Sequence, residues 1–159
     1  MEPAYLKRFV VYGLPKGKGR PQFTTINGHT RAVTPEATVN YENLVKMEYH
    51  AQLGDYSIPP KTMIFALIDA FLPIPNSVSN KKRQQMIAGT IRPIIKPDYD
   101  NVGKIVCDSL NKIAYYDDSA IVDGRVRKFY SEKPRVEVFL STEEIDSKTI
   151  DDWRKKNHA

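Results

Sequence analysis

The sequence predicts a single α+β domain in which a mixed β-sheet packs against two or three helices. Its 159 residues are about one domain's worth of chain. Three observations carry the prediction: a nearly continuous apolar run over 62–72, a one-sided apolar helix after residue 98, and two alternating segments within 121–140. The expected domain spans residues 1–141, and residues 142–159 are expected to form a polar C-terminal helix or tail.

The composition is typical of a globular protein and excludes several classes. Hydrophobic residues make up 41% and charged residues 27%, which argues against a disordered chain. The single cysteine, Cys107, allows neither an internal disulfide nor a cysteine-rich zinc site. No apolar run approaches the roughly 20 residues of a membrane-spanning helix, and the N-terminus does not resemble a signal peptide. We therefore expect no membrane association and a cytoplasmic location.

The first half of the chain predicts two strands around a helix. Residues 5–12 are rich in aromatic and β-branched types, which favours a strand. A helix is expected from Thr34, whose hydroxyl can cap it, to Gly54. The apolar run 62–72 is long enough for a central strand that is covered on both faces. Asp69 interrupts this run, so it either faces solvent at a strand end or lies near a metal site.

Basic residues cluster in two segments that precede the acidic stretch. The proline- and glycine-rich loop before Thr34 is either a basic arm over nucleic-acid phosphates or a solvated hairpin. A short helix over 77–89 carries three cations in its first turn, where they oppose the helix dipole and favour a negatively charged partner. The net charge of +5 is compatible with nucleic acid as that partner. The candidate DNA-binding residues are Lys16, Lys18, Arg20, Arg31, Lys81, Lys82, Arg83, Lys96, Arg125 and Arg127, although solvated surface charge is the alternative for each of them.

The segment from Lys96 to Asp123 reverses this charge. After Lys96 it contains two lysines, Lys104 and Lys112, and six carboxylates. The carboxylates are Asp98, Asp100, Asp108, Asp117, Asp118 and Asp123. An acidic patch between basic flanks suits a divalent cation that faces a polyanion, because carboxylates bind hard cations while lysine and arginine neutralise phosphates.

A helix within this segment separates core residues from candidate site residues. Its apolar positions recur at helical spacing and define one buried stripe. The stripe consists of Val102, Ile105, Val106, Ser109, Leu110 and Ile113. Asp100, Lys104 and Asp108 fall four residues apart on the other side, so the helix is expected to present an acid-base-acid row to an opening.

Two pairs of acids flank this helix and are candidates for one metal site. Asp98 and Asp100 stand at its start, and Asp117 and Asp118 follow it in a turn. Carboxylates that lie close together repel unless a cation bridges them, and oxygen ligands favour Mg²⁺, with Mn²⁺ as a substitute. The alternative is structural, with helix caps at the first pair and a polar turn at the second. The spacing alone also fits phosphatases and polymerases.

The end of the chain is expected to complete the sheet. Residues 121–130 and 134–140 alternate around a short polar turn and predict a terminal hairpin. Trp153, in the polar tail, either anchors that tail or lies at a partner surface.

The acidic segment also resembles a known family. KPDYDNVGKIVCDSLN followed by YYDDSAIVD is similar to the RusA family of Holliday junction resolvases, which carries an Asp-x-Asp-Asn-x-x-Lys helix start and then an Asp-Asp before a strand. GKGRPQFT and TPEATVNYE also resemble the N-terminal part of the phage-type members, so the resemblance extends to about residue 140. Ala120 departs from the glutamine that relatives often carry there.

The resemblance implies specific roles and a specific reaction. Asp98, Asp100 and Asp118 match the family's catalytic metal ligands, Lys104 matches its catalytic lysine, and Asp117 is expected to assist. The family resolves four-way DNA junctions in recombination and repair, as a Mg²⁺-dependent homodimer that cuts two opposed strands. The expected setting is a bacterial or phage-infected host cytoplasm. The alternatives are a nuclease for flaps or forks and a non-catalytic nucleic-acid-binding module.

Overall fold

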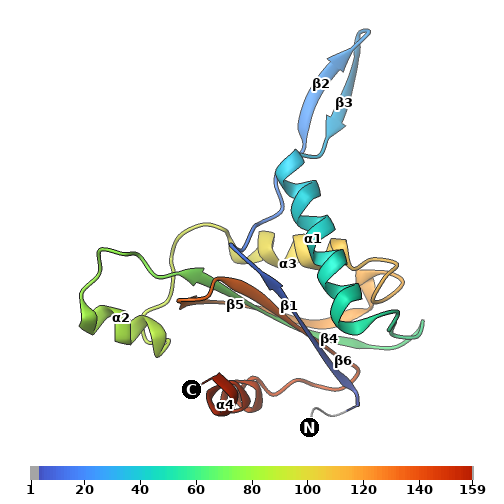
Figure 1. The fold of residues 1–159 in the computed structure, drawn as a ribbon. Coiled ribbons are helices and arrows are strands. Elements are labelled where there is room, and N and C mark those ends of the chain that lie inside the picture. Colours follow the sequence, from blue (N-terminus) through green and yellow to red (C-terminus); the bar gives the residue numbers. More distant parts are fainter. Residues whose placement is uncertain (1–3, 159) are drawn as a thin grey trace.

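A four-stranded sheet forms the centre of the protein, which the computed structural model describes over residues 4–158 (Figure 1). Its strands are β1 (Leu6–Tyr12), β4 (Ile64–Pro73), β5 (Ile121–Ser131) and β6 (Arg135–Ser141), in the spatial order β1-β6-β4-β5. β6 pairs antiparallel with β1 and β4, whereas β4 and β5 pair in parallel. The predicted α+β class with one mixed sheet is confirmed.

The hairpin predicted at the end of the chain is wrong, because β4 lies between β5 and β6. Ile68 of β4 stands opposite Val126 of β5 on one side and Val138 of β6 on the other. The run from Ala66 to Leu72 is buried throughout. A strand covered on both faces keeps its backbone N–H and C=O groups away from water, so pairing along both edges satisfies them.

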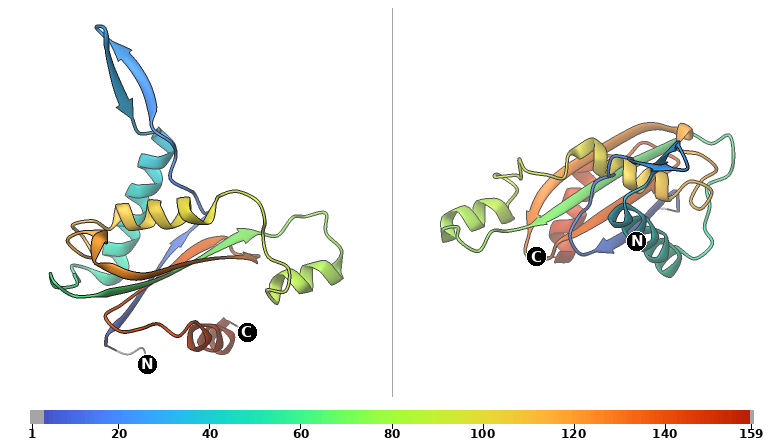
Figure 2. Two further views of the ribbon diagram at one scale, coloured as in Figure 1. Left: turned by 180° about the vertical axis from the view of Figure 1, so that it is seen from behind. Right: turned by 90° about the horizontal axis from the view of Figure 1, so that it is seen from above.

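Helices cover both faces of the sheet. α1 (Glu36–Leu53) and α3 (Tyr99–Ser109) lie on one face, and α4 (Ser147–His158) lies on the other (Figures 1 and 2). Pro35, rather than the predicted Thr34, occupies the N-cap of α1. α2 (Asn80–Ile87) lies in the connection from β4 to β5, and the Ser79 hydroxyl caps it by accepting a hydrogen bond from the Lys82 amide at 3.3 Å. Within residues 4–158, no helix combines the length and the apolar character that a bilayer crossing requires.

The main core lies between the sheet and the two helices α1 and α3. Val45 and Tyr49 of α1 and Ile105 of α3 pack against Ile68 and Val138 of the sheet, and all five are buried. The predicted apolar stripe is buried from Val102 to Leu110, whereas its last member, Ile113, lies beyond α3 and is half-buried. On the other side of the helix, Asp100 and Lys104 are exposed and Asp108 is half-buried. The core therefore fixes α3 on the sheet with its polar row turned outward.

A second contact, rich in charge, holds α4 to the opposite face. Asp69 of β4 and Glu137 of β6 are neighbours across the sheet, and both are 0% exposed. Nη2 of Arg154, on α4, lies 2.7 Å from an Asp69 carboxylate oxygen and 2.8 Å from one of Glu137. Both expectations for Asp69 are wrong: it lies within the strand, and its partners are Arg127 and Arg154 rather than solvent or acids of a metal site.

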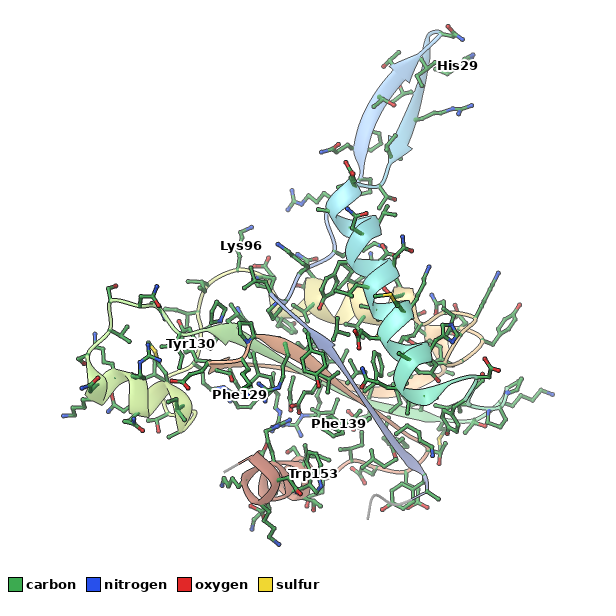
Figure 3. The ribbon with its side chains drawn as sticks, in the orientation of Figure 1. His29, Lys96, Phe129, Tyr130, Phe139 and Trp153 are labelled. Carbon is green, nitrogen blue, oxygen red and sulfur yellow. The ribbon has the colours of Figure 1, made fainter. Side chains whose placement is uncertain are left out.

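Aromatic contacts reinforce this arrangement. The guanidinium of Arg8, on β1, lies 4.9 Å from the centre of the Trp153 ring and 6.0 Å from that of Phe139. Figure 3 shows Trp153 on α4 beneath the sheet that carries Phe139. The polar C-terminal segment thus contains a helix that contributes an anchor to the sheet.

A separate two-stranded hairpin stands apart from the rest. It comprises β2 (Gln22–Ile26) and β3 (His29–Val33), joined by Asn27 and Gly28 with φ values of 50° and 76°. Asn-Gly is the pair that favours this tight turn, because both residues tolerate positive φ. We call residues 20–34 the arm; it projects beyond the N-terminal end of α1 (Figures 1 and 2).

Candidate active site

The first pair of predicted acids stands at the start of α3. Asp98 occupies the N-cap with extended backbone (φ −67°, ψ 144°), yet its side chain makes no capping hydrogen bond to the described part of the chain. Asp100 Oδ1 accepts a hydrogen bond from the Asn101 amide at 3.0 Å. Both side chains are exposed. Capping does not account for Asp98, so its carboxylate is available to an incoming cation.

The loop before α3 is tied to the edge strand β5. The guanidinium Nε of Arg92 donates to the Lys128 carbonyl at 2.8 Å, and the Lys128 ammonium donates to the Ile95 carbonyl. These contacts fix the position of the loop that carries Lys96 and leads to Asp98. Figure 3 shows Lys96 on this loop, on the side of the sheet that carries the arm.

The basic N-terminal loop closes the other side of an open cleft. The cleft, of about 380 Å³, is lined by Pro15, Lys16, Gly17, Lys18, Lys96, Pro97, Asp98 and Asn101. The Lys18 amide donates to the Asn101 carbonyl at 2.9 Å, which holds the loop against α3. A Cβ at Gly17 would lie 2.9 Å from the Asn101 Cβ, so this close approach requires glycine. The predicted acid Asp98 thus shares its cleft with Lys16 and Lys96.

The second pair of acids lies at the other end of α3. The Asp118 amide donates to Asn111 Oδ1 at 2.9 Å, which fixes the turn, and Asp117 Oδ2 accepts from the Ser119 amide at 3.1 Å. Asp117 thereby caps the short 3₁₀ helix η1 (Asp118–Ala120). Hydrogen bonds from Ser119 hold the pKa of Asp117 below its ordinary value. The structural alternative therefore fits Asp117, whereas the Asp118 side chain does not cap η1 and remains a candidate ligand.

Asp118 has an acidic neighbour that the sequence analysis did not place there. Partial burial raises the pKa of Asp118, and the nearby carboxylates of Asp108 and Asp117 raise it further. Asp108 Oδ2 in turn lies 3.2 Å from the Lys18 ammonium, which also contacts Glu42 Oε1 at 2.9 Å. Excess negative charge at this end of α3 is thus partly neutralised by a lysine from the N-terminal loop.

The two ends of α3 are too far apart for one metal ion. Asp98 and Asp108 are ten residues apart, which corresponds to about 15 Å along a helix. Over residues 4–158, no three His, Cys, Asp or Glu side chains come close enough together to hold a metal. Asp98, Asp100 and Asp118 therefore do not converge within one chain. Each end supplies hard oxygen ligands of the type Mg²⁺ accepts, but only part of a set.

Lys104 lies between the two acidic ends. It is exposed on the polar row of α3, one turn from Asp100 and one turn from Asp108. The position is compatible with the catalytic role that the family resemblance implies for this lysine.

The remaining predicted DNA-binding residues fall into three places. Arg20 and Arg31 are exposed on the arm, and Lys81 and Lys82 are exposed on α2. Arg83 pairs with Glu132 at 3.0 Å, and Arg125 donates to the Ser147 hydroxyl at 3.0 Å.

Arg127 is the exception among them. It donates to both carboxylate oxygens of Asp69 at 2.7 Å and to Asp151 at 3.0 Å, and its side chain is only 11% exposed. This placement on the α4 face argues against a DNA contact, because every guanidinium nitrogen is already engaged.

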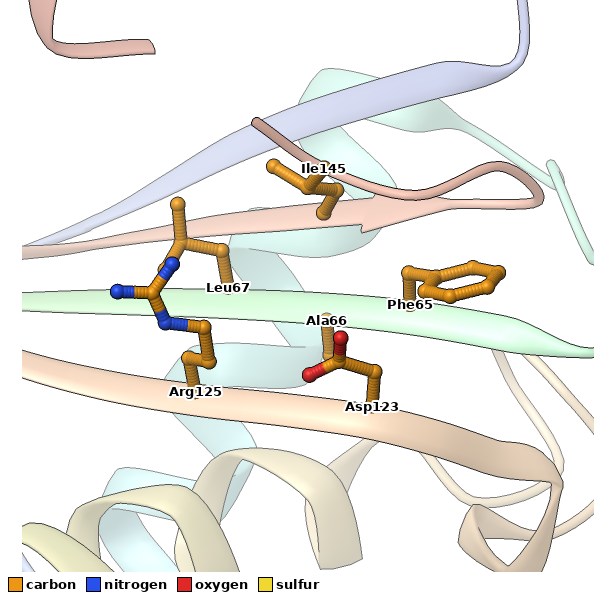
Figure 4. Close-up of a pocket in the computed structure, with 6 residues that line it drawn as sticks. All are labelled: Phe65, Ala66, Leu67, Asp123, Arg125 and Ile145. Carbon is orange, nitrogen blue, oxygen red and sulfur yellow. The ribbon is translucent and has the colours of Figure 1, made fainter. Parts of the chain in front are cut away.

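A small cavity lies apart from the cleft at the start of α3. Phe65, Ala66 and Leu67 of β4, Asp123 and Arg125 of β5, and Ile145 line it (Figure 4). It has room for about one water molecule. We assign no part of the site to it.

Sequence reasoning missed Glu42 and the pairing of Lys18. Glu42 is one of several charged residues on α1, and nothing in its local pattern distinguishes it. The contact depends on how α1 crosses α3, which is a property of the tertiary structure. The sequence did indicate that Asp108 belongs with the site residues, because helical spacing places it on the same face as Asp100 and Lys104.

Comparison with known proteins identifies the family. The family model described as Endodeoxyribonuclease RusA matches residues 13–141. The chain belongs to the RusA family. The match confirms the resemblance found in the acidic segment and extends over the cleft, α3 and three strands of the sheet, β4, β5 and β6, because it begins just after β1.

The chain is also similar to a bacterial protein. A Bacillus subtilis (strain 168) protein described as "Uncharacterized protein YqaN" is 38% identical over 139 residues, which cover 84% of this chain and 94% of that protein. The RusA family is one of endodeoxyribonucleases, so membership supports a nuclease whose substrate is DNA.

Replacing Lys18 with methionine tests whether this lysine pairs with the acids Glu42 and Asp108 or binds a DNA phosphate. Burial lowers the pKa of Lys18, but hydrogen bonds and charge attraction from Glu42 and Asp108 raise it above 10.5 overall. We expect Lys18→Met to reduce cleavage and to leave the salt dependence of DNA binding unchanged. A lysine that binds a phosphate would instead reduce the slope of log affinity against log salt by about one. Lys16→Met, in the same loop and exposed, is the matched comparison.

Proposed function

We propose that this protein is a Mg²⁺-dependent endonuclease that resolves four-way DNA junctions by cutting two opposed strands. The observation that carries the proposal is the cleft at the start of α3 in this RusA-family chain. There the carboxylate of Asp98, which makes no capping hydrogen bond to the described part of the chain, shares the cleft with Lys16 and Lys96. Lysines that neutralise phosphates and a carboxylate that is open to a hard cation are the parts that metal-assisted phosphodiester hydrolysis needs.

The separation of the acids supports a homodimer as the active form. Asp98 and Asp100 stand at one end of α3 and Asp118 stands near the other. A two-fold axis that sets two α3 helices antiparallel brings opposite ends of the two helices together. Each of the two sites then combines Asp98 and Asp100 of one chain with Asp118 of the partner subunit. Two sites related by a two-fold axis suit paired cuts in a substrate that is itself branched and symmetric.

The residues of the chain divide the chemistry among them. Asp98, Asp100 and Asp118 would hold Mg²⁺, with Mn²⁺ as a substitute, and the bound ion would supply an activated water and neutralise charge on the phosphate. Lys104 points its ammonium away from the core, where it stabilises charge that develops on the scissile phosphate. Asp117 keeps its cap on η1 and thereby orients Asp118. Lys16 and Lys96 position the DNA backbone without reading its sequence.

The decisive experiment compares DNA shapes. The protein is incubated with a synthetic four-way junction, a linear duplex and a flap of the same sequence, with Mg²⁺, with Mn²⁺ and with EDTA. We expect paired, symmetric nicks in the junction only, and only with metal. Equal cutting of the flap would show that the protein cleaves branched DNA in general rather than four-way junctions. If no DNA is cut, the protein is a nucleic-acid-binding module rather than a nuclease.

Metal binding has its own expected signature in thermal stability. A ligand that binds only the folded protein stabilises it by mass action, by about 2.7 kcal/mol at 100 times its dissociation constant. We expect Mg²⁺ to raise the melting temperature of the wild-type protein and not that of Asp100→Asn. If the site is shared between subunits, the increase grows with protein concentration. An equal increase in the variant would show that the ion binds elsewhere.

A further inference from the structure

The arm exposes apolar side chains that a free protein ordinarily covers. Every residue from 20 to 34 is exposed, including Phe23 at 73%, Ile26 at 56% and Val33 at 44%. A two-stranded hairpin without further strands is only marginally stable in water. An arm with these properties is suited to being covered by a partner.

The arm is nevertheless firmly rooted beside the candidate active site. The Gly19 amide donates to the hydroxyl of Thr38 at 3.0 Å, and Thr38 is buried in the first turns of α1. A Cβ at Gly19 would lie 2.7 Å from that hydroxyl, so the root fits closely. At its other end, β3 runs through Pro35 directly into α1. The loop that leads into the arm also lines the cleft that contains Asp98, so the base of the arm lies next to that cleft.

Charge indicates what covers the arm. The sequence contains no Asp or Glu between Glu2 and Glu36, and the arm itself carries Arg20 and Arg31. A second copy of the arm would bring like charges together, whereas a nucleic acid complements them. A two-stranded ribbon also has the width that a DNA groove admits.

The strand register divides the arm into two different faces. Phe23 stands opposite Ala32, and Thr24 stands opposite Arg31. Because neighbouring side chains of a strand alternate, the Phe23–Ala32 pair and the Thr24–Arg31 pair project to opposite faces. One face thus presents an aromatic ring among small side chains, and the other presents a cation.

We propose that the arm recognises the branch point of the DNA: Phe23 stacks on bases exposed where the duplex arms meet, and Arg31 holds an adjacent backbone phosphate. This rests on the proposed function. A branch point interrupts base stacking, whereas a linear duplex keeps its bases stacked. An aromatic ring stacks on any base, so Phe23 selects for DNA shape rather than sequence.

The test measures shape selectivity in the full chain. Asp100→Asn serves as a non-cutting background for binding in Mg²⁺, with a four-way junction and a linear duplex that carry 2-aminopurine at the branch point or its linear equivalent. In this background, Phe23→Ala should lower affinity for the junction about ten-fold and leave affinity for the duplex unchanged. It should also abolish the fluorescence change at the branch point, and Phe23→Trp should retain both properties.

Two matched variants check the roles of the faces. Ile26→Ala truncates an exposed apolar side chain on the face opposite Phe23 and should keep the selectivity for the junction. Arg31→Ala should weaken binding to junction and duplex alike and reduce the salt slope by about one.

The failure of this inference is separable from the failure of the proposed function. If Phe23→Ala keeps the junction-to-duplex ratio of its parent, or if it changes the mass of the protein by light scattering instead, the arm does not read the branch point. If the wild-type protein does not nick junctions in Mg²⁺, the proposed function is rejected, whatever the arm binds.

Discussion

Asp100→Asn is expected to reduce junction cleavage by about 10³-fold or more while leaving the protein folded and able to bind the junction. The substitution removes charge from a carboxylate that is exposed at the start of α3, and the amide oxygen can still accept the hydrogen bond from the Asn101 amide. Cleavage is measured on a labelled junction in Mg²⁺, and folding by circular dichroism. Asp123→Asn, on the edge strand β5, is the control, since this exposed acid of the same segment should be dispensable.

Mixing two inactive variants distinguishes a shared site from one within a single chain. Asp100→Asn and Asp118→Asn are each expected to be inactive alone. In a mixed dimer with shared sites, one site contains both substituted residues, and the other site contains the unchanged Asp100 of one chain and the unchanged Asp118 of the other. Random exchange of subunits should therefore restore about a quarter of the wild-type sites, and each restored dimer should nick a single strand. No recovery after demonstrated subunit exchange would place each site within one chain and contradict the antiparallel arrangement of the two α3 helices.

Glu137→Gln is expected to cause the largest loss of stability, about 3–5 kcal/mol. Glu137 is 0% exposed and accepts hydrogen bonds from Arg135 at 2.9 Å and Arg154 at 2.8 Å, with Arg8 at 3.2 Å. Removing its charge leaves three arginines around a neutral side chain. Urea unfolding measures the loss, and Glu132→Gln, whose exposed carboxylate pairs with Arg83, should cost at most about 1 kcal/mol. Equal losses in the two variants would mean that the network contributes little.

The same residue predicts how stability depends on pH. Burial alone would raise the pKa of Glu137. The attraction of Arg154, Arg8 and Arg135 has the larger effect, so the pKa of Glu137 lies below its ordinary value of 4.5. A carboxyl whose pKa is lower in the folded state stabilises the protein fully above its unfolded pKa and loses this contribution as the pH falls through the folded pKa. Between about pH 4.5 and pH 3, the wild-type protein should therefore lose more stability than Glu137→Gln. Parallel melting curves across this range would contradict the prediction.

Local patterns in the sequence were sufficient to predict helix α3 and the acids at its ends. The stripe from Val102 to Ser109 and the exposed row from Asp100 to Asp108 both follow from helical periodicity. The position of Asp98 just before the helix follows from the motif itself. These features depend on residues that are close in sequence, so one stretch of chain determines them.

Contacts between distant segments were decided only by the tertiary structure. Three examples are the insertion of β4 between β5 and β6, the bridge from Lys18 to Glu42 and Asp108, and the pairing of Asp69 and Glu137 with arginines on neighbouring elements. Strand order depends on which edges satisfy buried backbone groups, and ion pairs depend on which faces meet, so neither appears in local periodicity. The sequence by itself determined which acids stand at the ends of α3; the fold decided that they lie a helix length apart, because a continuous helix on a sheet holds its ends at a fixed separation.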